Sequence, residues 1–129
     1  MRTLLAFAAV VEIGTGLLLL IAPDRVVTLL LGAGTPGDAA LLGRFLGIAL
    51  LALGVACWPS RKHVKDGSPA FRGMLIYNAA VALYLASVGA FGQAGGVLLW
   101  PAVVLHAVVT YLLIRTSRDA SSADRAAAP

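Results

Sequence analysis

The sequence predicts an all-α integral membrane protein: a four-helix bundle with up-down-up-down order and a short interfacial helix after the first span. The first observation is composition, since 60% of the 129 residues are hydrophobic and only 12% are charged. A soluble domain is about half apolar and about a quarter charged. The second observation is four apolar segments, each close to the length of about 20 residues that crosses a bilayer as a helix. The third is that lysines and arginines gather on one side of these segments.

One domain, residues 1–115, holds the four expected spans, at about residues 3–22, 41–58, 73–91 and 96–114. The first span begins like a secretory signal, but Leu20 is too large for the position two before a cleavage at Ala22. We therefore expect this segment to be retained as a helix. In the second span Arg44 lies in the first turn, where its long side chain can reach the headgroups.

A short helix is expected directly after the first span. Pro23 suits the first position of a helix, and Asp24 suits its positive end. The run Val26–Leu31 is too short to cross, and Gly32 and Gly34 provide a stop. These features predict a helix that lies at the membrane interface.

The later connections differ in kind. Residues 59–72 form a polar, basic loop, whereas the "GQAG" of residues 92–95 predicts a tight turn between two antiparallel spans. Residues 116–129 are polar and have few side chains that pack, so we expect a disordered cytoplasmic tail.

The distribution of cations predicts the orientation. With four crossings, the two termini and the basic loop share one side, which carries eight of the ten lysines and arginines. They are Arg2, Arg61, Lys62, Lys65, Arg72, Arg115, Arg118 and Arg125, against Arg25 and Arg44 on the other side. Positive charge stays inside, so both termini are expected in the cytoplasm, in the inner (plasma) membrane. Topology thus explains the net charge of +4, and we expect the lipid bilayer as a partner and no nucleic acid.

Glu12 is an acid inside the first span. It lies nine residues from Thr3, about 13 Å along a helix and close to the midplane. An ionised carboxylate there costs at least about 2.5 kcal/mol, so a partner is expected. His106 lies at nearly the same depth in the fourth span and is the expected partner. Three interpretations stay open: a structural bond between the two spans, a proton or ligand site, and a polar contact with another subunit.

Further polar side chains extend this candidate site. Tyr77, Asn78 and Thr110 are expected at shallower depth and Tyr84 at greater depth, in one polar seam. Small residues predict where helices pack: these are Gly16, Gly43, Gly47, Ala82 and Ala86. Gly43 and Gly47 form a GxxxG pattern, for which packing inside the bundle and self-association are the two interpretations.

Signatures of catalysis are missing from the sequence: there is no phosphate-binding loop, no nucleophile with a base, and no metal-ligand spacing. We therefore expect no enzyme activity, no catalytic residue, no metal and no cofactor. The first functional hypothesis is a structural or accessory subunit, in a homo-oligomer or a larger membrane complex. The alternative is a small proton-linked transporter or channel-like oligomer that uses Glu12 and His106.

Four stretches between about residues 10 and 114 carry a resemblance. They are "VEIGTGLLLLIAPDRVVTLLLG", "GRFLGIALLALGVACWP", "YNAAVALYLA" and "LLWPAVVLHAVVTYLL". Together they resemble uncharacterised short four-helix bacterial integral membrane proteins, which implies the architecture and a bacterial inner membrane. Glu12 and the glycines after it are similar to the first helix of small multidrug-resistance transporters, which implies proton and cation binding in a dimer. Size and glycine-rich helices are also similar to DoxX-type membrane proteins.

Overall fold

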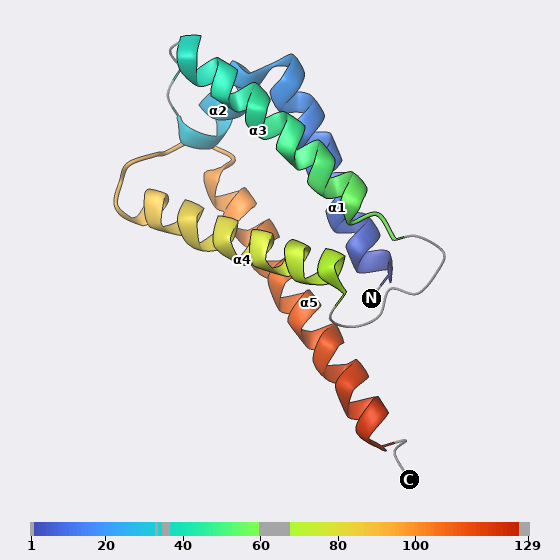
Figure 1. Ribbon diagram of the computed structural model, residues 1–129. Helices are drawn as coiled ribbons and strands as arrows, with labels where there is room; N and C mark the ends of the chain where they lie inside the picture. The colour runs from blue at the N-terminus through green and yellow to red at the C-terminus, as the bar shows by residue number, and fades with distance from the viewer. Residues whose placement is uncertain (1, 33, 35–36, 60–67, 127–129) are drawn as a thin grey trace.

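The computed structural model describes residues 2–32, 34, 37–59 and 68–126, without the side chains at positions 38, 120, 121 and 123–126. In these ranges the chain is helical, with no strand (Figure 1). The helices are α1 (Arg2–Ile21), α2 (Pro23–Leu31), α3 (Gly37–Ala56), α4 (Pro69–Ala90) and α5 (Leu99–Ala126). All but α2 are long and apolar enough to cross a membrane. The prediction of an all-α chain with four membrane-length helices is therefore confirmed.

The long helices associate as two pairs, α1 with α3 and α4 with α5. Glycines allow α1 and α3 to touch backbone to backbone. A Cβ added at Gly16 would lie 2.7 Å from the carbonyl oxygen of Gly47, and a Cβ at Gly47 would lie equally close to that of Gly16. A Cβ at Gly54 would lie 2.9 Å from the carbonyl oxygen of Ala9. Such close approach is how helices pack where apolar surroundings give no hydrophobic driving force.

The short helix α2 has the start and the stop that the sequence predicts. Pro23 stands in its first turn together with the acidic Asp24. Gly32 ends the helix in the left-handed conformation, with φ of 83°, and its N–H donates to the carbonyl of Thr28 at 2.8 Å. The prediction of a short helix is thus confirmed, while its place at the membrane interface stays a prediction.

The connection from α4 to α5 is longer than the predicted tight turn and contacts α2. It runs over residues 91–98, and its N–H groups at Gly95 and Leu98 donate to the carbonyls of Leu31 and Leu29, at 3.0 and 2.9 Å. Gly96 lies so close to α2 that a Cβ there would collide with the backbone of residues 29 and 30. We call this contact the α2 clasp. It gives partners to carbonyls that a helix end leaves without an intrahelical bond. The end of α4 has its own signal in Gly92, which takes the left-handed conformation with φ of 67°.

The helix α5 also differs from the sequence prediction, because it does not end near residue 114. It continues through Ala126, so residues 116–126 are helical where a disordered tail was expected. Hydroxyl groups of this polar stretch find their partners within the helix. Those of Thr116, Ser117 and Ser122 donate to carbonyls three or four residues earlier, at 2.9 to 3.0 Å, and so bond within the helix. Residues 127–129 lie outside the described part.

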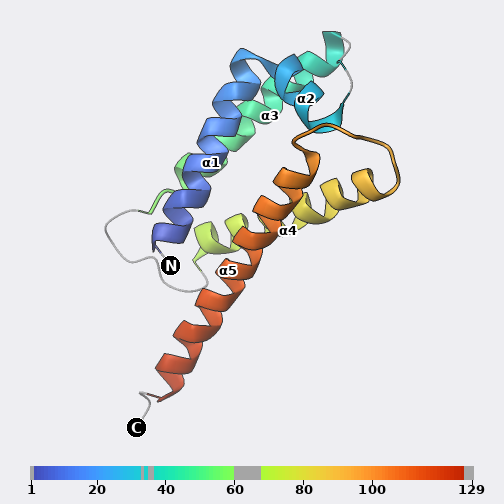
Figure 2. The same ribbon diagram turned by 180° about the vertical axis from the view of Figure 1, so that it is seen from behind.

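The core lies where the two helix pairs meet, at one end of the molecule. It consists of Leu5, Ala8, Ala9, Cys57, Phe71, Met74, Val109 and Leu113. The Cys57 thiol reinforces this contact, because it donates to the carbonyl of Ala70 at 3.3 Å. The ribbon views agree that α4 is inclined to α5, so the α4–α5 pair is not a parallel stack (Figures 1 and 2).

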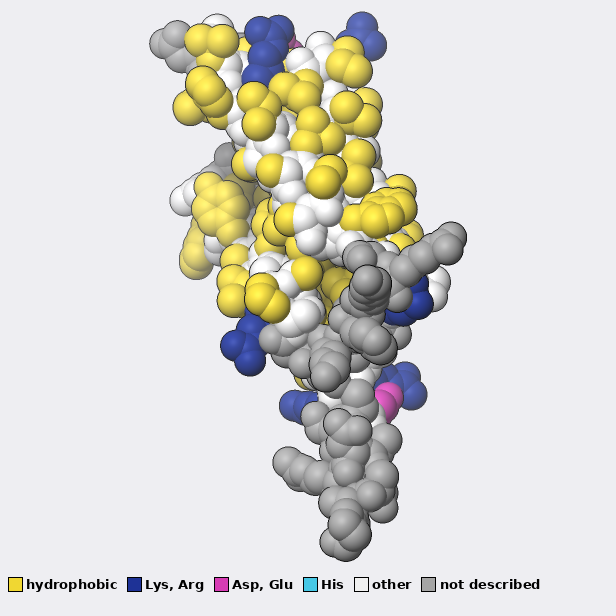
Figure 3. Space-filling model, turned by 45° about the vertical axis from the view of Figure 1, so that its right-hand side comes forward, with side chains coloured by type: hydrophobic (Ala, Val, Ile, Leu, Met, Phe, Trp, Pro, Cys, Tyr) yellow, Lys and Arg dark blue, Asp and Glu magenta, His cyan; other side chains and the backbone are white. Residues whose placement is uncertain are grey.

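The outer surface of the long helices is apolar. Large hydrophobic side chains are exposed on all four, for example Leu18 on α1, Phe45 on α3, Leu83 on α4 and Val104 on α5. Figure 3 shows hydrophobic side chains as a broad band, with basic side chains above and below it. A helix that is hydrophobic on its outer face as well as its inner face is typical of lipid surroundings.

Candidate functional site

Glu12 lies on the inner face of α1. The buried residues of this helix, Leu5, Ala8, Ala9, Glu12, Gly16 and Leu19, follow helical spacing, so the fold places the acid inward with the apolar residues. Only 1% of the Glu12 side chain is exposed. Its carboxyl group accepts a hydrogen bond from the hydroxyl of Tyr77 on α4. This bond joins the α1–α3 pair to the α4–α5 pair.

Tyr77 also contacts the third helix of the site. Its ring lies 5.8 Å from the ring of His106 on α5, measured between centroids, with the two planes at 80°. This edge-to-face arrangement is a favoured geometry for aromatic rings. Tyr77 therefore lies between Glu12 and His106, with its hydroxyl toward the acid and its ring against the imidazole.

His106 is held by Asn78, which is 2% exposed. The Asn78 Nδ2 group donates to the carbonyl of Met74 at 2.9 Å, and Oδ1 lies 2.8 Å from His106 Nδ1. The Met74 carbonyl fixes the amide orientation, because a flipped amide would set two acceptor oxygens against each other. Nδ1 of His106 must then carry the hydrogen and donate to Asn78.

Glu12, Tyr77, His106 and Asn78 form what we call the polar network. Each buried side-chain nitrogen or oxygen in the described residues has a hydrogen-bond partner. The expected direct bond between Glu12 and His106 is replaced by contacts through Tyr77. The Tyr77 side chain contacts both residues, and their equal depth in a membrane stays a prediction.

The structure places the other predicted members of the seam differently. Tyr84 lies two turns after Tyr77 on the same side of α4, but it is 67% exposed, since α1 packs against only the beginning of α4. The Thr110 hydroxyl donates to the backbone carbonyl of His106 at 2.8 Å, so it bonds within α5 and not to the network side chains. Of the expected seam, Tyr77 and Asn78 join the network, whereas Tyr84 does not.

The small residues of the candidate site lie at helix contacts inside the chain. Gly43 and Gly47 are buried: a Cβ at Gly43 would lie 3.0 Å from the Cβ of Pro23, and Gly47 faces Gly16. The GxxxG surface is thus covered by α1 and the start of α2. Ala82 lies between α4 and α5, and Ala86 is half-buried on α4.

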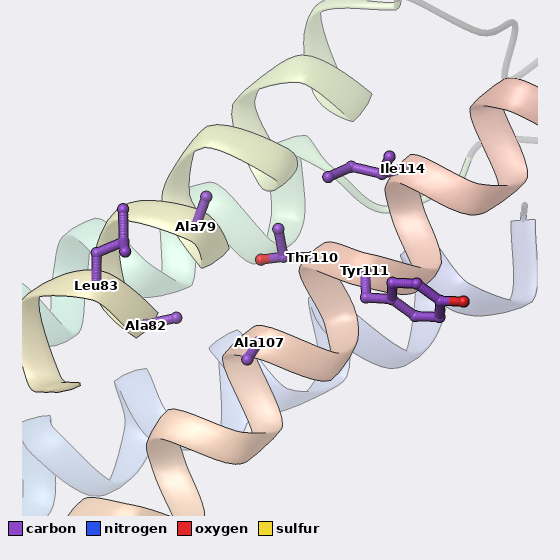
Figure 4. A pocket seen from close by; sticks show the side chains of 7 residues that line it. All are labelled: Ala79, Ala82, Leu83, Ala107, Thr110, Tyr111 and Ile114. Carbon is purple, nitrogen blue, oxygen red and sulfur yellow. The ribbon is translucent and has the colours of Figure 1, made fainter.

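A groove opens on the outer surface between α4 and α5, away from the network. We call it the α4–α5 groove; its volume is about 360 Å³, and it is lined by Ala79, Ala82, Leu83, Ala107, Thr110, Tyr111 and Ile114 (Figure 4). A second pocket lies beside α2, at Asp24, Arg25, Thr28 and Leu29. Sequence reasoning missed the groove, because it arises from alanines on two inclined helices.

The chemistry available at the network is hydrogen bonding among a carboxyl, a phenol, an imidazole and an amide. The described residues contain no group of three side chains able to hold a metal ion. The resemblances to known membrane protein families stay predictions. No protein-family model, curated protein or solved structure matches this chain.

Proposed function

We propose that the protein is a multi-pass membrane protein with four crossings and both termini in the cytoplasm, and that it acts as a structural or accessory subunit. Four apolar helices with hydrophobic outer faces support the membrane assignment. The core supports the alternating order, because it gathers residues from the beginning of α1, the end of α3, the beginning of α4 and the middle of α5. The excess of arginine and lysine at these ends supports a cytoplasmic location.

The structural role is supported above all by the burial of Glu12 and by its hydrogen bond with a side chain of another helix. Its carboxyl group is almost fully buried and bonded to Tyr77, which in turn packs on His106. Polar contacts of this kind stabilise helix association in lipid by roughly 0.6–2 kcal/mol each. The polar network therefore acts as an internal connection between the two helix pairs. The two pockets described above are lined by residues outside the network.

Membrane fractionation and a flux assay test this proposal. The protein is expected to stay with membranes washed in alkaline carbonate and to be released by detergent. Proteoliposomes with a pH-sensitive dye inside should then show the same proton leak for the wild type and for Glu12→Gln. A proton flux that requires Glu12 would replace the structural role by proton-linked transport, and release by carbonate alone would remove the membrane assignment.

A further inference from the structure

The α4–α5 groove has an apolar floor and two walls from different helices. Thr110 and Ile114 project from α5 toward α4, and Ala82 projects from α4 toward α5 (Figure 4). The Thr110 hydroxyl is already bonded to the carbonyl of His106, so the groove offers almost only carbon to a ligand. Its volume of about 360 Å³ is at the small end of the range of ligand pockets.

The rows of residues that line the groove lead to three arginines at one end. On α5, Arg115 follows Tyr111 by four residues and Arg118 follows Ile114 by four, so each arginine continues a lining row one turn further. On α4, Arg72 precedes Ala79 by seven residues, which is two turns on the same side of the helix. All three arginines are exposed.

The two helices run in opposite directions here, so these arginines lie toward the same end of the groove. The beginning of α4 packs with the middle of α5: Phe71 and Met74 share the core with Val109 and Leu113. From Ala107 to Ile114 the groove extends over about 10 Å, and Arg118 lies about 6 Å further. The sum of these two lengths is close to the thickness of one leaflet, which is half of a hydrocarbon core of about 30 Å.

We propose that the α4–α5 groove binds an anionic glycerophospholipid, with an acyl chain along the groove and the phosphate headgroup at Arg72, Arg115 and Arg118. This proposal rests on the membrane assignment above, since the groove faces lipid only if α4 and α5 cross the bilayer. The apolar lining of the groove suits the acyl chain, and the three arginines suit the negatively charged headgroup.

A second copy of the chain is the other candidate occupant of an apolar groove. In a symmetric dimer through this face, the three arginines of one copy would lie near the three arginines of the other. Like charges brought together in this way oppose association. The same arginines attract an anionic lipid, so charge favours the lipid.

Native mass spectrometry of the purified full chain tests the proposal. The delipidated protein in mild detergent is titrated with phosphatidylglycerol and, separately, with phosphatidylcholine of the same acyl chains. Arg72→Gln, Arg115→Gln and Arg118→Gln should each weaken phosphatidylglycerol binding by about fivefold and leave phosphatidylcholine binding unchanged. Arg44→Gln is the matched control, because this exposed arginine lies on α3, away from the groove.

A second pair of variants tests the acyl-chain position. Ala107→Phe places a ring in the groove at an exposed position and should reduce the binding of both lipids, whereas Ala52→Phe on the exposed face of α3 should not. Equal affinity for the two lipids, an Arg44→Gln effect as large as that of Arg118→Gln, or full lipid binding by Ala107→Phe would each overturn the proposal. If the wild type forms dimers whose abundance does not change with added lipid, and Ala107→Phe abolishes them, the groove would be assigned to a second copy of the chain.

The failure of this proposal is distinguishable from failure of the membrane assignment. A wild-type chain that stays in carbonate-washed membranes but shows no preference for phosphatidylglycerol leaves the membrane assignment intact and removes only the lipid site. A wild-type chain that leaves the membranes with carbonate removes both.

Discussion

Tyr77→Phe is the sharpest perturbation of the polar network, because it removes one oxygen and leaves the ring against His106. Glu12 then loses its hydrogen-bond donor, and with 1% exposure its carboxyl group has no access to water. Leaving a buried polar group without its partner costs about 1–3 kcal/mol, whereas measured side-chain hydrogen bonds in membranes average about 0.6 kcal/mol. We expect a loss of about 1–2 kcal/mol in the free energy of unfolding, since burial is nearly complete but Tyr77 itself is only half-buried.

The assay is unfolding by SDS in mixed micelles, followed by far-ultraviolet circular dichroism. Tyr84→Phe is the matched control: the same atom is removed from a side chain that is 67% exposed, and stability should stay within about 0.5 kcal/mol. A double-mutant cycle with Glu12→Leu isolates the pair, because replacing both partners by apolar groups restores part of what either single change loses. Equal effects of Tyr77→Phe and Tyr84→Phe, or full additivity in the cycle, would refute the assignment of the bond.

Three further predictions concern backbone contacts and orientation. Gly47→Ala should destabilise the chain by about 1–3 kcal/mol in the same assay, because the added Cβ would lie 2.7 Å from a backbone oxygen of α1. Gly14→Ala is the control: its Cβ would meet no atom within 4 Å, so this change should be neutral or stabilising. Gly96→Ala should open the α2 clasp and speed amide hydrogen exchange at Leu98, whereas Gly95→Ala, which has open space, should not. A protease site added to either end of the chain should be cut only from the cytoplasmic side.

Each of these predictions has an outcome that contradicts it. Gly47→Ala as stable as Gly14→Ala would mean that α1 and α3 do not touch through their backbones. Unchanged exchange at Leu98 in Gly96→Ala would remove the α2 clasp. Cleavage of the two ends from opposite sides would require an odd number of crossings.

The helices were predictable from the sequence where a short stretch of residues is enough to indicate them. Apolar length locates α1, α3, α4 and most of α5, and Pro23 with Gly32 locates α2. The helical end of α5 was not predictable in this way, because residues 116–126 lack an apolar period and are rich in polar side chains that also suit a tail without structure.

Four members of the polar network were predictable from the sequence, but the pairing of their side chains was not. The rise per residue gives the depth of Glu12 and His106, yet the rotation of each helix about its axis and the inclination of α4 decide which side chains meet. That inclination brings Tyr77 to Glu12 and leaves Tyr84 exposed. The α2 clasp was also hidden, since it uses backbone groups and leaves only glycines, at positions 32 and 96, as a trace in the sequence.

The α2 clasp has a consequence for the order in which the protein can be completed. The carbonyls of Leu29 and Leu31 receive their partners from Leu98 and Gly95, more than sixty residues later in the chain. During synthesis, a nascent chain that ends after α3 must leave these oxygens to water, because lipid offers no donor. The α2 clasp can therefore form only after residue 98 has been made, and until then these two carbonyls need a depth that water reaches.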